Sequence, residues 1–96
     1  YICRPVIHGE NVYLATIWSG AGSPNTGFVS ILDKNNQLIS APAGSEPIYQ
    51  NGQLQPMHQV LKIFQHPHDV CIDEDENLYV AQWNSGKTYP IKLIRV

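Results

Sequence analysis

The chain has 96 residues, of which 43% are hydrophobic and 15% are charged, and its formal net charge is −2. One small domain is the default expectation for this length. A weakly acidic chain lacks the basic patch that holds phosphate groups, so nucleic-acid binding is not expected. No apolar run approaches the roughly 18 residues of a membrane-spanning helix, so no membrane span is expected either.

Strand signals dominate the first half of the chain. Residues 11–18 are rich in β-branched and aromatic side chains and predict a strand. Residues 19–27 contain Gly, Pro, Ser and Asn and predict a loop. A second strand is expected at 28–33 and, after an Asn-rich turn, a short outer strand at 37–42.

The second half begins with a connection of weak signal at about 43–57. Residues 58–64 fit a strand or a helical turn, and their periodicity does not decide between the two. Strands are then predicted at 68–73, 77–83 and 89–96, with an acidic turn between the first two. Pro90 stands near the start of the last strand, where a missing amide does least harm.

Two cysteines, Cys3 and Cys71, each lie in an apolar stretch. Two thiols do not define a disulfide framework. Buried free thiols are therefore expected, and a Cys3–Cys71 bridge is the open alternative. The sequence begins at Tyr1 without a methionine or a signal-like segment, which we interpret as a processed product, an excised piece or the ordered part of a longer protein.

An internal repeat organises the chain. Asn-Val-Tyr-Leu-Ala at 11–15 matches Asn-Leu-Tyr-Val-Ala at 77–81, and in both copies a tryptophan and a Ser-Gly pair follow. Strands joined by tight turns in such a repeat are typical of propeller blades. The prediction is an all-β fold with a first blade at 1–42, an inserted connection at 43–63 and a second blade at 64–96 that lacks its outer strand.

A blade needs neighbours on both faces, and two blades are too few to close a ring. We therefore expect a fragment of a larger propeller, with the remaining blades as its partners. Self-assembly with other chains is the alternative. The missing fourth strand of the second blade would come from elsewhere, as in propellers whose two chain ends share one blade.

The second copy resembles the NHL repeat, a Pro-x-Gly/Asp-Val-x-Val-Asp pattern followed by a turn and Asn-Leu-Tyr-Val-Ala-Asp. Here it reads Pro-His-Asp-Val-Cys-Ile-Asp at 67–73 and Asn-Leu-Tyr-Val-Ala at 77–81. The first copy is a weaker match, with Pro5, Ile7 and 11–15. The resemblance implies a six-bladed or similar propeller, and such a fold hosts many functions.

More narrowly, the Pro-His-Asp run resembles a run in the peptidyl-α-hydroxyglycine α-amidating lyase domain, which is a propeller of this type. That resemblance implies that His68 is a zinc ligand and Asp69 a calcium ligand. His66 stands where the family has an active-centre Met. The implied reaction cleaves a hydroxyglycine-extended peptide to an amide and glyoxylate, and the implied location is extracellular or periplasmic.

The residues themselves suggest a site as well. His66 and His68 are two apart, so in an extended chain both imidazoles project to one side, where they suit zinc. Residues before an innermost strand lie near the mouth of a propeller channel, and Arg4 is placed to clamp a carboxylate there. The alternatives are that the histidines cap a strand entry and that Arg4 is a plain surface residue.

The acidic turn and the aromatic residues complete the candidates. The Asp-x-Asp-x-Asn run from Asp73 opens like an EF-hand calcium loop, but Leu78 and Asn84 occupy the positions that need Gly and Glu, so a hairpin turn is predicted. Trp18 and Trp83 begin loops and are expected to contact a ligand. Tyr13 and Tyr79, which recur in the repeat, are expected in the core between blades.

These observations lead to one functional hypothesis and one rival. The first is a propeller fragment with a metal-dependent lyase-like or hydrolase-like site, in which His66 and Arg4 are catalytic and His68 and Asp69 bind metal. The rival is a non-enzymatic propeller that binds a peptide, protein or glycan on its loop face. Nucleophilic catalysis is not expected, because no nucleophile motif is present.

Overall fold

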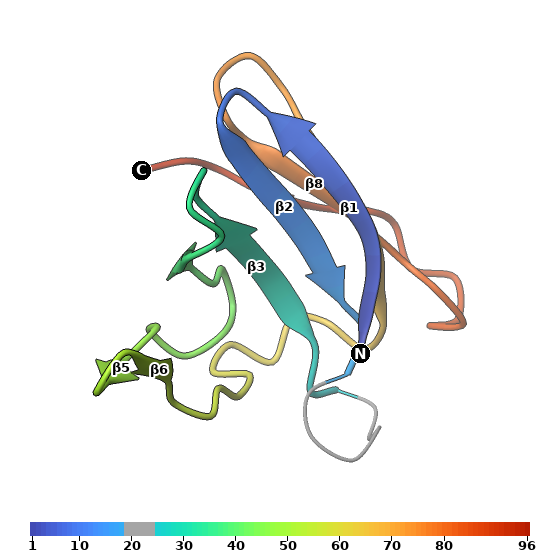
Figure 1. The fold of residues 1–96 in the computed structure, drawn as a ribbon. Coiled ribbons are helices and arrows are strands. Elements are labelled where there is room, and N and C mark those ends of the chain that lie inside the picture. The colour runs from blue at the N-terminus through green and yellow to red at the C-terminus, as the bar shows by residue number, and fades with distance from the viewer. Residues whose placement is uncertain (19–24) are drawn as a thin grey trace.

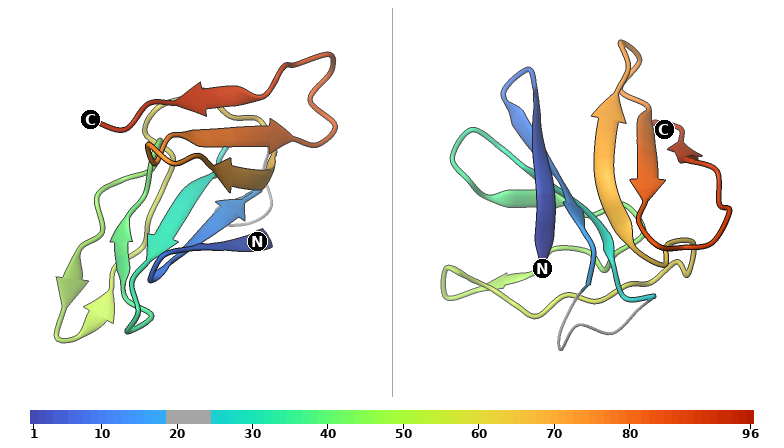
Figure 2. Two further views of the ribbon diagram at one scale, coloured as in Figure 1. Left: turned by 90° about the horizontal axis from the view of Figure 1, so that it is seen from above. Right: turned by 90° about the vertical axis from the view of Figure 1, so that its right-hand side faces the viewer.

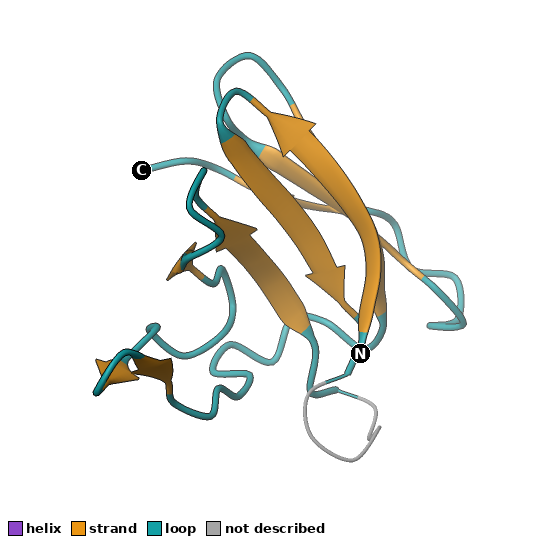
Figure 3. Ribbon diagram, in the orientation of Figure 1, coloured by secondary structure: helices purple, strands orange, loops and turns teal. Residues whose placement is uncertain are grey.

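The computed structural model describes residues 1–18 and 25–96, and within these ranges it contains strands and turns but no helix. In the described residues, nine strands form three antiparallel sheets, ordered β1-β2-β3-β4, β5-β6 and β7-β8-β9 (Figures 1 and 3). The strands are β1 Ile2–His8, β2 Asn11–Thr16, β3 Phe28–Leu32, β4 Leu38–Ser40, β5 Tyr49–Gln50, β6 Gln53–Leu54, β7 Pro67–Ile72, β8 Leu78–Gln82 and β9 Ile91–Leu93. The expected all-β class is confirmed. Across the described ranges, no helix is long and apolar enough to cross a membrane.

The two larger sheets pack against each other and enclose the core (Figure 2). Strand alternation places Tyr13, Ala15, Val29 and Ile31 on one face of the first sheet. Val70, Leu78 and Val80 face them from the second sheet, and all seven side chains are buried. Burial of these apolar side chains is the main force that holds the sheets together.

The connection at 43–63 covers one edge of this core. Phe64, which follows it, is 1% exposed, and the chain passes so close to Phe28 that a Cβ on Gly44 would lie 2.8 Å from that ring. The connection contains the hairpin β5–β6, which the sequence analysis did not predict. Its turn is Asn51-Gly52, both with positive φ, as a two-residue hairpin loop requires.

Several boundaries differ from the prediction. Residues 58–64 form neither a regular strand nor a helical turn; an isolated bridge joins Gln59 to Gly44. The last predicted strand shrinks from 89–96 to Ile91–Leu93. Cys71 is exposed and Cys3 is half-buried, so the expectation that both thiols are buried is wrong for Cys71, and both thiols are free.

The hairpins β1–β2 and β7–β8 have the same register. Tyr13 pairs with Val6 as Tyr79 pairs with Cys71, and Leu14 pairs with Pro5 as Val80 pairs with Val70. In both hairpins the ladder then shifts by one residue, between Ile2 and Pro5 and between Pro67 and Asp69. The repeat seen in the sequence is thus also a repeat in strand pairing, down to the position of a β-bulge.

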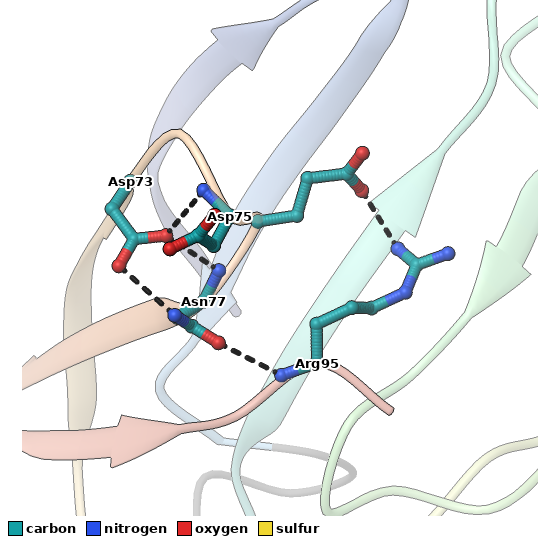
Figure 4. A network of polar contacts seen from close by, with 5 residues as sticks. Asp73, Asp75, Asn77 and Arg95 are labelled. Carbon is teal, nitrogen blue, oxygen red and sulfur yellow. Dashed lines mark hydrogen bonds and ion pairs between the residues drawn. The ribbon is translucent and has the colours of Figure 1, made fainter.

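Two aspartates build matching turns. Asp33 Oδ1 accepts hydrogen bonds from the amides of Asn35 and Gln37, and Asp73 Oδ1 accepts them from Asp75 and Asn77. Asp73 Oδ2 accepts two more, from Asn77 Nδ2 at 3.1 Å and the Tyr79 hydroxyl at 2.9 Å. The hairpin turn expected after Asp73 is confirmed, and both carboxylate oxygens of Asp73 accept hydrogen bonds from residues 75–79 (Figure 4).

Arg95 secures the Asp73 turn from the C-terminal segment. Its amide donates to Asn77 Oδ1 at 3.0 Å, and its guanidinium contacts Glu76 at 2.8 Å (Figure 4). Desolvation acts to raise the pKa of Asp73, but the hydrogen bonds from Asn77, Tyr79 and Asp75 outweigh it and hold the pKa below its usual value. The turn therefore depends on an ionised Asp73.

Candidate functional site

Four aromatic side chains meet at one end of the two sheets, which we call the aromatic cluster: Tyr1, Trp18, His66 and Trp83. The His66 ring lies 6.2 Å from the Trp18 ring and 5.9 Å from the Trp83 ring, both edge to face. Tyr1 contacts Trp18 in the same geometry at 5.6 Å. Figure 1 places this end beside the N-terminus, where β1 begins and β2 ends.

Backbone hydrogen bonds hold the members of the cluster in place. The Tyr1 nitrogen donates to the Trp18 carbonyl at 2.9 Å, which ties the start of β1 to the end of β2. Trp83 donates its amide to the His66 carbonyl at 3.0 Å, which does the same for β7 and β8. Gln82 Oε1 accepts from the amides of both Gln65 and His66. These hydrogen bonds fix the main chain of the residues that carry the rings.

Gly27 allows the two sheets to meet at this end. A Cβ at this position would lie 2.3 Å from the Thr16 carbonyl oxygen and 2.7 Å from Pro67 Cδ. Only glycine permits such a close approach of β2, the start of β3 and the start of β7. This close packing brings Trp18 next to His66.

Ser85 contacts two members of the cluster. Its side chain is buried, at 7% exposure, and its hydroxyl lies 3.3 Å from His66 Nδ1 and donates to the Trp83 carbonyl at 2.9 Å. Trp83 itself is 51% exposed and offers a large apolar surface. Trp18 Nε1 is buried and has no hydrogen-bond partner in the described residues.

A second feature adjoins the cluster, where the bulges of β1 and β7 face each other. Arg4 Nη1 and Asp69 Oδ2 are 3.5 Å apart, and Asp69 Oδ1 accepts a hydrogen bond from the Val70 amide at 2.8 Å. The pair lines a shallow hollow of about 410 Å³ together with Val6, Val70, Cys71, Tyr79 and Ala81. Both charged side chains remain partly exposed to solvent.

The predicted metal ligands do not gather into a coordination site. His68 is the extra residue of the β7 bulge and is exposed, because the bulge interrupts the alternation that would have aligned it with His66. Asp69 is engaged by Arg4 and by the Val70 amide. Within the described residues no three His, Cys, Asp or Glu side chains form a group suited to a metal ion. These side chains do not fit a complete zinc or calcium site.

The predicted site residues therefore fall into two groups. His66 contacts both Trp18 and Trp83, for which separate roles were predicted, while Arg4 and Asp69 form an ion pair. Sequence reasoning did not assign Tyr1, Gln82 or Ser85 to the site. Ser85 alone had a signal, since it belongs to the repeated Ser-Gly pair that follows each tryptophan.

Comparison of this chain with protein-family models, with curated proteins and with solved structures finds no match.

Proposed function

We propose that this chain forms two neighbouring blades of an NHL-type propeller, and that the aromatic cluster binds a saccharide at the loop end of those blades. The remaining blades would be its structural partners, and an extracellular or periplasmic location would suit a glycan ligand. The architecture and the ligand rest on different observations and have separate tests.

The architecture is supported by the way in which the sheets stack. The face of the first sheet that carries Tyr13 and Ala15 packs on the face of the second sheet that carries Val80. Because the hairpins share one register, Tyr79 and Ala81 are the equivalents of Tyr13 and Ala15, yet they lie on the open face of the second sheet. Another sheet of the same kind would complete that face.

The opposite face of the first sheet fits the same scheme. Leu14 and Pro5 are the equivalents of Val80 and Val70, and they lie on the outer face together with Ile7, which is 76% exposed. The outer face of the second sheet therefore carries the same positions that the first sheet uses in the interface. The outer face of the first sheet carries the positions that the second sheet uses there. Repeated head-to-tail packing of this kind closes into a ring when the rotation per unit allows it.

Cys71 provides a test of this arrangement. It is exposed on the face that a third blade would cover, whereas Cys3 is half-buried in the first hairpin. In a full-length protein containing this segment, we expect a maleimide to modify Cys71 at least tenfold more slowly than in the isolated chain. Equal rates in the two proteins would contradict the blade arrangement.

The ligand proposal is carried by the contact of Trp18, Trp83 and His66 at one end of the sheets. Ser85 and Gln82, which hydrogen-bond to His66, are uncharged. An exposed aromatic ring beside neutral polar groups suits an uncharged ligand that has both an apolar C–H face and hydroxyl groups. A saccharide has that chemistry, and a charged peptide does not.

The experiment titrates the protein with cellotriose, chitotriose and mannotriose and follows tryptophan fluorescence and heat. We expect one of them to bind and Trp83→Ala to weaken that binding about tenfold, which corresponds to about 1.4 kcal/mol. Tyr89→Ala is the matched control, because Tyr89 is an exposed aromatic residue that follows the same strand and, among the described residues, makes no ring contact with the cluster. Binding of a peptide instead of all three sugars would contradict the proposal.

A metal-dependent lyase-like enzyme is the second candidate. The observation that favours it is the Arg4–Asp69 pair at the edge of the 410 Å³ hollow, where an arginine can hold a carboxylate. His68 and Asp69 would need further metal donors from outside the described residues. If the purified full-length protein holds neither zinc nor calcium, and His68→Ala changes neither metal content nor activity, this candidate is excluded.

A further inference from the structure

Ser85 makes two contacts through a hydroxyl group that carries a single proton. Its oxygen lies 2.9 Å from the Trp83 carbonyl oxygen and 3.3 Å from His66 Nδ1. A carbonyl oxygen only accepts hydrogen bonds, so the Ser85 proton points to Trp83. The Ser85 oxygen then has only lone pairs to offer to His66.

This arrangement decides which nitrogen of His66 carries the proton. For the second contact to be a hydrogen bond, Nδ1 must be the donor, because Ser85 has already used its proton. In a neutral imidazole one nitrogen donates and the other accepts. His66 is therefore the Nδ1–H tautomer, and its Nε2 carries a lone pair.

The His66 side chain is partly exposed to solvent. Within residues 1–18 and 25–96, no group hydrogen-bonds to its Nε2. An acceptor without a partner in those ranges thus lies beside the exposed ring of Trp83, whose centroid is 5.9 Å from that of His66.

We propose that Ser85 is a positioning residue, which holds His66 in the Nδ1–H tautomer and thereby makes Nε2 the acceptor for a hydroxyl group of the ligand. This inference deepens the proposed saccharide site and rests on it for the identity of the ligand. The assignment of the tautomer rests on the Ser85 geometry alone. Trp83 would supply the surface on which the sugar ring packs, and His66 would select a hydroxyl at one position on that ring.

Nuclear magnetic resonance of ¹⁵N-histidine-labelled protein tests the tautomer without a ligand, at a pH where imidazole is neutral. We expect the wild type to show protonated Nδ1 and unprotonated Nε2. Ser85→Ala should move His66 toward the Nε2–H form, which an unconstrained imidazole favours, and Ser85→Thr should restore the wild-type pattern because it keeps the hydroxyl. A wild-type Nε2–H form, or no change in Ser85→Ala, would overturn the proposal.

The second arm adds the trisaccharide that binds most tightly. We expect the Nε2 resonance to shift on saturation and Ser85→Ala to weaken binding about fivefold, with Ser85→Thr within twofold of wild type. Binding that depends on Trp83 but leaves Nε2 unmoved would overturn the acceptor role of His66. If no sugar binds while the tautomer is as expected, the saccharide function fails and the positioning by Ser85 stands.

Discussion

The hairpins β1–β2 and β7–β8 share a sequence motif, a pairing register and a bulge, but their equivalent residues have different surroundings. Tyr13 is 3% exposed and Ala15 is fully buried, whereas Tyr79 is half-buried and Ala81 is exposed. The hairpins themselves do not differ at these positions. The difference arises because the Tyr13 face has a sheet packed on it and the Tyr79 face does not.

Local sequence thus builds the hairpin, whereas the neighbouring sheet determines which of its side chains are buried. The half-buried Tyr79 makes two polar contacts. Its hydroxyl donates to Asp73, and its ring lies 5.4 Å from the Lys92 ammonium group. The buried Tyr13 instead contacts the partly exposed His8 edge to face. The same residue type is thus a packing element in one copy and part of a turn network in the other.

The largest expected effect comes from replacing the two tyrosines. Tyr13→Ala removes a buried aromatic ring and should lower the free energy of unfolding by about 3–5 kcal/mol. Tyr79→Ala should cost less than half as much, because its ring is partly in solvent. Urea unfolding followed by tryptophan fluorescence measures both. Equal losses would mean that the two faces are equally covered.

Gly27→Ala should have the next largest effect. The added Cβ meets backbone oxygens of Thr16 and Ile17 and the ring of Pro67, so β2 and β7 must separate, at a cost of about 1–3 kcal/mol or more. Gly44→Ala is a useful comparison, because its Cβ meets the side chain of Phe28 and leaves the aromatic cluster alone. Only Gly27→Ala should also change the near-ultraviolet circular dichroism of Trp18. If neither variant loses stability, the close approach of the sheets is not as described.

The two aspartate turns give a smaller contrast. Asp73 accepts four hydrogen bonds and Asp33 accepts two from main-chain amides, so Asp73→Asn should lower the thermal midpoint more than Asp33→Asn. Tyr79→Phe removes one of the four bonds and should fall between Asp73→Asn and wild type. A larger loss in Asp33→Asn than in Asp73→Asn would contradict this ranking.

The same contrast predicts a pH dependence. The folded pKa of Asp73 is lowered, so its contribution to stability is complete above the unfolded value of about 3.9 and is lost as the pH falls through the folded value. Wild-type stability should therefore drop as the pH falls from 5 toward 2 more steeply than that of Asp73→Asn. Urea unfolding at several pH values measures the slopes, and parallel slopes would exclude an ionised Asp73 as the cause.

The smallest effect concerns the ion pair between the equivalent bulges of the two hairpins. Arg4 and Asp69 are 3.5 Å apart and partly solvated, so Arg4→Gln should cost only about 0–1 kcal/mol, and less at high salt. The exposed pair of Arg95 and Glu76, at 2.8 Å, is the matched control. A loss of several kcal/mol in Arg4→Gln would mean that the pair is more deeply buried than its exposure indicates.

The sequence indicated several candidate site residues, but it did not predict which of them contact each other. His66, Trp18 and Trp83 were recognised from their positions beside strand ends. Their contact depends on Gly27, where the absence of a side chain lets two sheets converge. The expected alignment of His66 and His68 was based on strict alternation, and the bulge in β7 removes that basis. Bulges have no reliable sequence signal, because they depend on the partner strand.

The all-β class, the repeat of 11–15 at 77–81 and the turns after Asp33 and Asp73 could be predicted from the sequence, because alternation of side chains and turn chemistry act over a few neighbouring residues. The strand Ile2–His8, and with it the first hairpin, was not predicted. The packing of the sheets determines which tyrosine is buried, that Cys71 is exposed and that Ser85 hydrogen-bonds to His66. Those outcomes depend on contacts between segments far apart in the chain. Such contacts follow from how whole sheets pack, and no short stretch of residues encodes them.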